Sequence, residues 1–209
     1  MYASEFGQDK WIIEDVFNGL RGGYFVDIGA YDGQSYSNTY VLEKEYEWTG
    51  ICVEPNSNFY SSLVQRRQCI CEKFCIASEN TVVDFVSDKI NSSGIIADFS
   101  DKTLLAPSLE THKVEKKVAI SLETLLHIHK APKLIHYLSL DTEGSEYEIL
   151  KNFNFEKYRI LAITVEHNAH MGASNQLKRD NIRSLLIMND YVYITSNLVE
   201  DYYLHKSYI

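Results

Sequence analysis

The sequence has few prolines, few cysteines and no excess of positive charge. Three prolines in 209 residues, with no Gly- or Ser-rich stretch, give no sign of a linker, so residues 1–209 are expected to form one domain. Four cysteines are too few for a small disulfide scaffold and fit reduced thiols in a cytoplasmic protein. Lys and Arg number 20 against 29 Asp and Glu, a net charge of −9. This balance disfavours nucleic acid and anionic membrane surfaces as partners.

Long apolar runs are also lacking. No segment approaches the roughly 20 apolar residues that span a bilayer. The first ten residues are polar and acidic, unlike the basic and then apolar start of a secretory signal, so we expect a cytoplasmic location and no membrane contact. Hydrophobic residues make up 45% of the chain and charged residues 23%, which is typical of a globular domain with a sizeable core.

Short apolar segments alternate with helical patterns along most of the chain. Continuous apolar runs predict buried strands, and apolar positions at helical spacing predict amphipathic helices. The predicted strands are residues 23–28, 49–54, 69–76, 134–140 and 159–165, with a further one at 81–86. The predicted helices are residues 10–20, 36–46, 59–67, 121–129, 145–152 and 175–188.

The C-terminal end departs from this alternation. Residues 191–195 and 199–204 flank the turn at 196–198 and predict an antiparallel hairpin. Strand–helix alternation that closes in a hairpin indicates a doubly wound α/β sheet with an antiparallel edge. Ligands of such sheets bind beyond the carboxyl ends of the strands, where the strand order reverses. Functional residues are therefore expected directly after each strand.

Acidic residues lie at the ends of the first two predicted strands. Residues 26–33 (VDIGAYDG) contain Asp27 ahead of Gly29; the glycines allow close backbone approach, and the acid suits a ligand with an ammonium group rather than a diphosphate. This turn therefore disfavours a nicotinamide oxidoreductase. The second strand ends in Glu54, whose carboxylate can accept hydrogen bonds from both hydroxyls of a ribose.

These motifs, with several others, resemble the S-adenosylmethionine site of class I methyltransferases and, more narrowly, the FkbM family of O-methyltransferases. The resemblance implies a Rossmann-like fold with a mostly parallel seven-stranded sheet and an antiparallel C-terminal hairpin. It also implies transfer of a methyl group to a hydroxyl, most often of a sugar or glycan. The matching motifs are residues 7–9 (GQD), 26–33, 37–39 (SNT), 51–56 (ICVEPN), 138–146 (LSLDTEGSE) and 165–168 (VEHN).

The resemblance also implies a set of cofactor-binding residues. Asp27 and Gly29 would line the methionine part, Glu54 would bind the ribose, and Asn56 would lie beside the adenine. An N-terminal helical segment, residues 1–22, would cover the site, although Asp9 suits a helix N-cap equally well. The full predicted set is Gln8, Asp9, Asp27, Gly29, Tyr31, Asn38, Glu54, Pro55, Asn56, Ala77, Ser78 and Asp141.

The ends of the fourth and fifth predicted strands carry the candidate chemistry. O-methylation requires an aligned acceptor oxygen and a group that removes or weakens its proton. Asp141, Glu143 and His167 are the predicted catalytic residues, with Glu143 or His167 as the base. Alternatively, Asp141 and Glu166, with His167 or Asn168, hold Mg²⁺ or Mn²⁺, which polarises the hydroxyl. A purely structural interpretation makes residues 143–146 the cap of the following helix.

Other functions remain open alternatives. One is a module that binds S-adenosylmethionine without catalysis, and another is an O-methyltransferase of a non-sugar small molecule. The motifs and hairpin occupy nearly the whole chain, so acceptor selection is expected from loops around residues 88–112 and 168–176, or from a partner subunit of a homo-oligomer.

Overall fold

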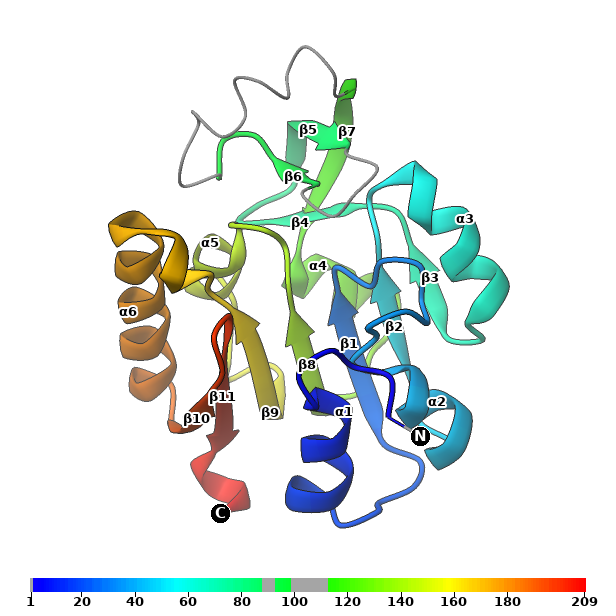
Figure 1. Ribbon diagram of the computed structural model, residues 1–209, viewed down its shortest axis with the longest axis vertical. Coiled ribbons are helices and arrows are strands. Elements are labelled where there is room, and N and C mark those ends of the chain that lie inside the picture. Colours follow the sequence, from blue (N-terminus) through cyan, green and yellow to red (C-terminus); the bar gives the residue numbers. More distant parts are fainter. Residues whose placement is uncertain (1, 88–92, 99–112) are drawn as a thin grey trace.

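The computed structural model describes residues 2–87, 93–98 and 113–209. A seven-stranded sheet with helices on both faces forms the body of the protein, and a second sheet lies above the carboxyl ends of its central strands (Figure 1). No helix in the described ranges is long and apolar enough to cross a membrane.

The large sheet has the strand order β10-β11-β9-β8-β1-β2-β3. The five strands β9, β8, β1, β2 and β3 pair in parallel, whereas β11 pairs antiparallel with both β9 and β10. The predicted doubly wound sheet with an antiparallel C-terminal hairpin is therefore confirmed, as is its count of seven strands. The strands are β1 (Tyr24–Ile28), β2 (Thr49–Val53), β3 (Ile70–Glu72), β8 (Leu134–Leu140), β9 (Arg159–Glu166), β10 (Tyr191–Ser196) and β11 (Glu200–His205).

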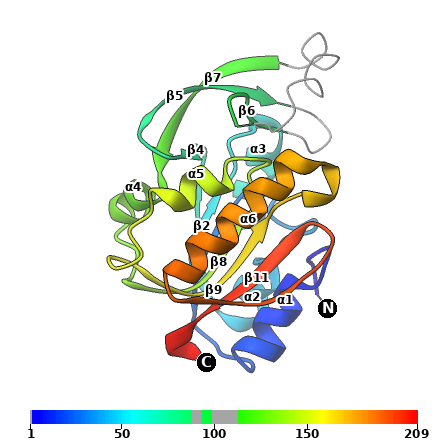
Figure 2. The same cartoon turned by 90° about the vertical axis from the view of Figure 1, so that its left-hand side faces the viewer.

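Helices cover both faces of this sheet (Figure 2). Apolar side chains from α4 (Leu122–Ile128), α5 (Glu146–Lys151) and α6 (Ala173–Met188) pack on one face in the largest core cluster. The other face packs against α1 (Gln8–Lys10), a π-helix (Trp11–Val16), α2 (Tyr40–Tyr46) and α3 (Ser57–Arg66). Two short 3₁₀ helices, Ala169–Met171 and Lys206–Tyr208, follow β9 and β11.

The ends of several helices differ from the predicted ranges. The helix expected at residues 10–20 begins at Gln8 and ends at Val16, and the one expected from residue 36 begins only at Tyr40. The helix expected at 121–129 is α4, and Ser121 caps it, because its hydroxyl accepts a hydrogen bond from the Thr124 amide at 3.1 Å.

A second, four-stranded sheet is the main feature that the sequence patterns did not predict. Its order is β4-β7-β5-β6. Strand β5 matches the strand expected at 81–86, whereas β6 and β7 were not expected. The predicted strand at 69–76 divides between the two sheets, as β3 and β4. Much of the predicted loop at 88–112 lies outside the described residues, and its described part contains β6. The strands are β4 (Cys75–Ala77), β5 (Thr81–Ser87), β6 (Gly94–Ile95) and β7 (Lys113–Ser121).

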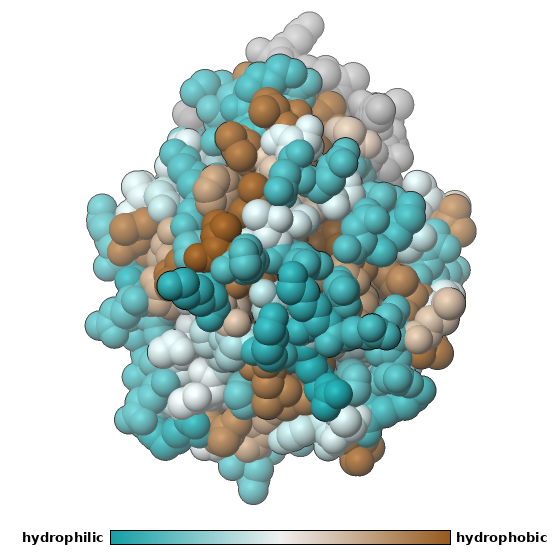
Figure 3. All heavy atoms as spheres, turned by 180° about the vertical axis from the view of Figure 1, so that it is seen from behind, coloured by the Kyte–Doolittle hydropathy of each residue, from teal (hydrophilic) through white to brown (hydrophobic). Residues whose placement is uncertain are grey.

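The surface opposite to the view of Figure 1 has hydrophilic and hydrophobic residues interspersed (Figure 3). This face therefore does not point to a binding site by its hydropathy alone.

Candidate active site

A cavity of about 360 Å³ lies between the carboxyl ends of the central strands and the second sheet. This volume is in the range of small-molecule sites. In the sheet order, β1 stands between β2 and β8, where the strand order reverses, which is the position that the fold predicts for a ligand. Carboxylates line the cavity from five of the strands or the loops that follow them and from the N-terminal segment: Glu5, Asp27, Glu54, Asp141, Glu143, Glu166 and Glu200.

The turn after β1 brings three strands into backbone contact. The amides of Gly29 and Ala30 donate hydrogen bonds to the Val53 carbonyl at 2.9 and 3.0 Å. Gly29 has φ +90°, and a Cβ added there would lie 1.8 Å from the carbonyl oxygen of Asp141. Only glycine fits this left-handed, crowded position. The glycine at this position is therefore required to seat β1 against the β8 loop at the floor of the cavity.

Glu54 lies at the end of β2 with 6% of its surface exposed. Its two carboxylate oxygens accept hydrogen bonds from the amides of Tyr31 at 3.0 Å and Asn56 at 2.7 Å. Burial raises the pKa of Glu54 to about 8, although these two amides favour the charged form. The rings of Tyr31 and Phe59 pack 4.2 Å apart and line the cavity beside it. A fixed carboxylate beside aromatic rings suits a nucleoside.

Asp27 holds the loop that precedes α2. Its carboxylate accepts a hydrogen bond from the Thr39 hydroxyl at 2.6 Å, and Arg67 donates to the same hydroxyl at 3.0 Å. Burial raises the pKa of Asp27, while the guanidinium of Arg67 opposes the shift. Arg67 is 5% exposed and also pairs with Glu43 at 2.9 Å. Sequence reasoning missed Arg67, because its partners lie far away in the chain.

Asn38, in the same loop, donates a hydrogen bond to the Ser139 hydroxyl at 2.9 Å and lines the cavity. Asn38 therefore reaches the cavity, and its role toward a cofactor stays a prediction.

Three carboxylates gather at the ends of β8 and β9. Asp141, Glu143 and Glu166 each offer an oxygen within 4.8 Å of the others. Burial raises the pKa of Asp141 to about 7 and that of Glu143 to about 9, and the neighbouring negative charges contribute to both shifts. The pKa of Glu166 is raised for the same reasons. Such a cluster can accept a proton or bind a cation.

Glu146 organises the loop that carries Glu143. Its carboxylate accepts hydrogen bonds from the amide and hydroxyl of Thr142, both at 2.7 Å, and from the Gly144 amide at 3.1 Å. Glu143 itself has φ +61° and Gly144 φ +133°. The interpretation of an acid at the helix start is thus confirmed for Glu146, whereas Glu143 lines the cavity.

Glu200 is a cavity carboxylate that sequence reasoning missed. It begins β11, pairs in register with Glu166 of β9, and is 3% exposed. Its carboxylate accepts a hydrogen bond from the side-chain amide of Gln8, which joins the N-terminal segment to the cavity lining. Burial, with the charge of Asp141, raises the pKa of Glu200 to about 8. Glu200 lies at the start of a hairpin strand and not after a parallel strand, so nothing in the sequence indicated that it lines the cavity.

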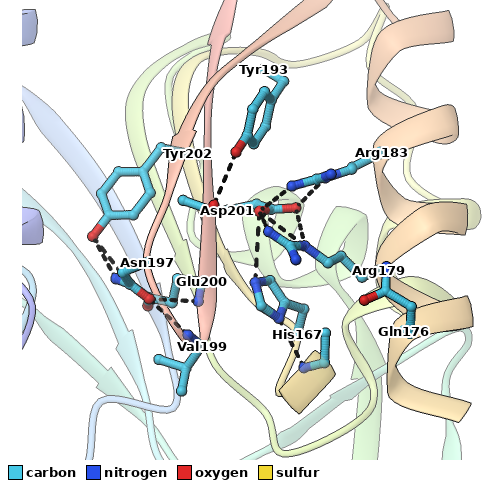
Figure 4. A network of polar contacts seen from close by, with 12 residues as sticks. His167, Gln176, Arg179, Arg183, Tyr193, Asn197, Val199, Glu200, Asp201 and Tyr202 are labelled. Atoms are coloured by element: carbon cyan, nitrogen blue, oxygen red, sulfur yellow. Dashed lines mark hydrogen bonds and ion pairs between the residues drawn. The ribbon is translucent and has the colours of Figure 1, made fainter. Parts of the chain in front are cut away.

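His167 does not line the cavity, and the prediction that it acts as a base does not fit its position. The side chain lies among Asp201 and two arginines of α6 (Figure 4), with Nε2 3.6 Å from the Asp201 carboxylate. Arg179 and Arg183 each bind that carboxylate at 2.7 Å. Burial lowers the pKa of His167 to about 4. These contacts make it part of the packing between β11 and α6.

Asn168 also lies outside the cavity lining, with a left-handed backbone at φ 47°. Its carbonyl accepts a hydrogen bond from the Asn175 side chain at 3.0 Å. The predicted metal set therefore needs correction, because Glu143 takes the place beside Asp141 and Glu166 that was expected for Asn168.

Four predicted cofactor residues likewise lie outside the lining. Asp9 is fully buried and accepts hydrogen bonds from the amides of Ala3 at 2.6 Å and Lys10 at 2.8 Å, so it folds its own segment. Asn56 caps α3 by accepting from the Asn58 amide at 2.9 Å. The other two are Ala77 and Ser78. The remaining predicted cofactor residues all line the cavity: Gln8, Asp27, Gly29, Tyr31, Asn38, Glu54, Pro55 and Asp141.

The chain is similar to known proteins in sequence and in structure. The sequence model described as "Methyltransferase FkbM domain" matches residues 27–195. Among curated proteins, no sequence matches the chain. Among solved structures, the crystal structure of a fibrillarin/Nop5p complex is similar with 14% identity and a TM-score of 0.43, covering 89% of this chain and 74% of that one.

Proposed function

Because the chain belongs to the FkbM methyltransferase family, we propose that it transfers a methyl group from S-adenosylmethionine to a hydroxyl group of a sugar or glycan. One observation carries this proposal. A single cavity joins a nucleoside-type half, formed by Glu54 and the Tyr31–Phe59 ring pair, to the carboxylate cluster Asp141, Glu143 and Glu166.

The first half of the cavity fits the cofactor. Both Glu54 oxygens are fixed by backbone amides, which leaves lone pairs for two ribose hydroxyls. The Gly29 turn keeps side chains away from the floor, and Asp27 lies beside it with a carboxylate suited to an ammonium group. Bound S-adenosylmethionine supplies a methyl group activated by a sulfonium.

The second half supports acceptor activation. The carboxylate cluster lies at the ends of β8 and β9. We assign Asp141 and Glu143 to hold the acceptor hydroxyl and, in their charged form, to take its proton. Burial raises the pKa of Asp141 to about 7, in the range that suits a general base, whereas Glu143, with a pKa of about 9, accepts a proton only after it has lost its own.

The same carboxylates are oxygen ligands of the kind that Mg²⁺ and Mn²⁺ prefer. A metal-assisted route therefore remains the alternative for weakening the hydroxyl proton. Activity that survives prolonged EDTA treatment, and is not raised by either metal, would assign the proton to a carboxylate; loss with EDTA and recovery with Mg²⁺ would assign the metal route.

Radiolabelled methyl transfer tests the function itself. The full chain is incubated with S-adenosylmethionine and a panel of sugars, glycans and non-sugar alcohols, while calorimetry measures cofactor binding. Label in a sugar fraction supports the proposal. Label only in a non-sugar alcohol would correct the acceptor class, and cofactor binding without any transfer would indicate a binding module.

A further inference from the structure

The cavity lining is acidic to an unusual degree. Seven carboxylates line it, and among its lining residues in ranges 2–87, 93–98 and 113–209 none is Lys, Arg or His. A site for a phosphorylated or carboxylated acceptor would present such cations, since buried anions require paired positive groups. The lining therefore disfavours anionic acceptors.

Nearby basic side chains are already engaged elsewhere. Lys178 donates hydrogen bonds to the carbonyls of Asp98 and Gly144, the latter at 2.9 Å. Lys117 pairs with Glu115 at 3.1 Å. Arg67 is occupied by Glu43, as described above. Arg67 and Lys117 offset part of the charge of Asp27 and Glu54. Within the described residues, no basic side chain pairs with Glu200 or with the Asp141, Glu143 and Glu166 cluster.

Glu200 stands out within that lining. In the part of the chain that the structure describes, it has no ion-pair partner, and its neighbours on the same sheet edge are the acids Glu166 and Asp141. Its hydrogen bonds come from neutral groups, the Gln8 amide and the Tyr202 hydroxyl, the latter at 3.5 Å. The amide of Gln8 fixes the direction of the carboxylate without supplying a charge.

The cofactor does not balance this charge. S-adenosylmethionine brings an ammonium, a sulfonium and a carboxylate, a net charge of one, and its ammonium suits Asp27 at the β1 turn. Glu200 begins β11, which β9 and β8 separate from β1 in the sheet, on the acceptor side of the cluster. Without a cation, burial raises the pKa of Glu200 to about 8, so it keeps its proton near neutral pH. An ammonium group from another molecule would stabilise its charged form in that position.

We propose that the acceptor carries a positive charge near its reacting hydroxyl, as an amino sugar does, and that Glu200 is the specificity-determining residue that pairs with its ammonium group. The proposal rests on the proposed function and names its substrate class. In the transfer, the acceptor oxygen forms a bond to the methyl carbon as the methyl–sulfur bond breaks, and the hydroxyl proton goes to a cluster carboxylate. The ammonium group takes no part in bond making.

The test compares acceptors of one ring type that differ in charge. The full chain receives methyl glycosides of one ring type bearing an amino group, its N-acetylated form or a uronic carboxylate, with radiolabelled S-adenosylmethionine. The inference predicts that kcat/KM for the amino form exceeds that for the N-acetylated form by at least about tenfold, as expected for a charged hydrogen bond, with the uronic form slowest. Preference for the neutral or anionic form would overturn it while leaving the methyltransferase function standing.

A variant identifies the residue. Glu200→Gln retains the size of the side chain and should lower kcat/KM for the amino form about tenfold or more, with little change for the N-acetylated form and for cofactor affinity. Glu123→Gln, which alters a surface pair with Lys157, is the matched control and should change neither. Equal losses for both acceptors would overturn the role of Glu200. If Glu200→Gln does not fold, the acceptor series on the wild-type protein still decides the inference. Cofactor binding without transfer to any acceptor would reject the proposed function and the inference together.

Discussion

Replacing Glu54 by Gln should weaken cofactor binding while leaving the fold intact. Both Glu54 oxygens accept hydrogen bonds from backbone amides, at 3.0 and 2.7 Å. The variant keeps one carbonyl acceptor but replaces the other oxygen with an NH₂ group, which cannot accept. It also removes the charge that would strengthen hydrogen bonds from two ribose hydroxyls.

The size of the effect follows from the hydrogen bonds to the charged group. A hydrogen bond to an ionised partner contributes about 1.5–3 kcal/mol. Loss of one such bond should therefore raise the dissociation constant of S-adenosylmethionine or S-adenosylhomocysteine by about 10- to 150-fold. Because burial raises the pKa of Glu54 to about 8, wild-type affinity should also increase as the pH rises from 7 to 9, and the variant should lose that dependence.

Isothermal titration calorimetry measures both effects. Glu72→Gln is the matched control, since Glu72 ends the neighbouring strand, pairs with His129 at 3.0 Å and lies outside the cavity lining. Its affinity should equal that of the wild type. Unchanged affinity in Glu54→Gln, with a folded circular dichroism spectrum, would refute the ribose-binding role.

Three further predictions concern folding and pH, each measured by urea denaturation. Gly29→Ala should lower the unfolding free energy by more than about 3 kcal/mol, because the new Cβ adds left-handed strain and a clash with the Asp141 backbone. Gly22 is also left-handed but has open space around it, so Gly22→Ala should lower the unfolding free energy by only about 1 kcal/mol. Equal losses in the two variants would contradict the crowding argument. Arg67→Met should cost about 3–5 kcal/mol by leaving buried Asp27 and Glu43 without their cation, and a loss below 1 kcal/mol would refute that role. The ligand-free protein should lose stability as the pH rises from 4.5 to 8, because Glu54 keeps its proton in the folded state and releases it when unfolded. The pH-dependent part of the unfolding free energy that is present in the wild type and absent in Glu54→Gln should reach about 5 kcal/mol. Parallel curves of unfolding free energy against pH for the two proteins would contradict this.

The central sheet could be predicted because its signals are local. The run at 159–165 is apolar along nearly its whole length and forms β9, a strand buried on both faces. The turn at 26–33 specifies its own shape through Gly29, and the paired segments at 191–204 form the expected hairpin. In each case a few adjacent residues contain the information.

The second sheet could not be predicted in the same way. Strand β7 begins Lys113-Val-Glu-Lys-Lys117, a mostly charged run, and its first residues are exposed or half-buried. Its pairing with β4 and β5 joins segments more than 25 residues apart in the chain. One open face leaves such a strand without a continuous apolar pattern.

The site residues at the ends of the parallel strands could be predicted from the sequence. The residues that reach the site through tertiary contacts could not. Asp27, Glu54 and Asp141 follow from their places after strands. Glu200 and Arg67 reach the site or its supporting loop only through the folded chain, and His167 is turned toward Asp201 by the α6 arginines. Sequence position alone does not determine which way a residue beyond a strand end faces.

Methyl transfer by the wild-type chain beside Glu143→Gln tests the central claim most directly. With radiolabelled S-adenosylmethionine and the acceptor panel, we expect label in a sugar hydroxyl, a fall in kcat of about 10²–10⁴-fold in the variant, and unchanged cofactor affinity. Glu148→Gln, on the exposed side of α5 where Glu148 pairs with Lys151, should retain wild-type turnover. Cofactor binding with no transfer by the wild type, or full turnover in Glu143→Gln, would contradict the account.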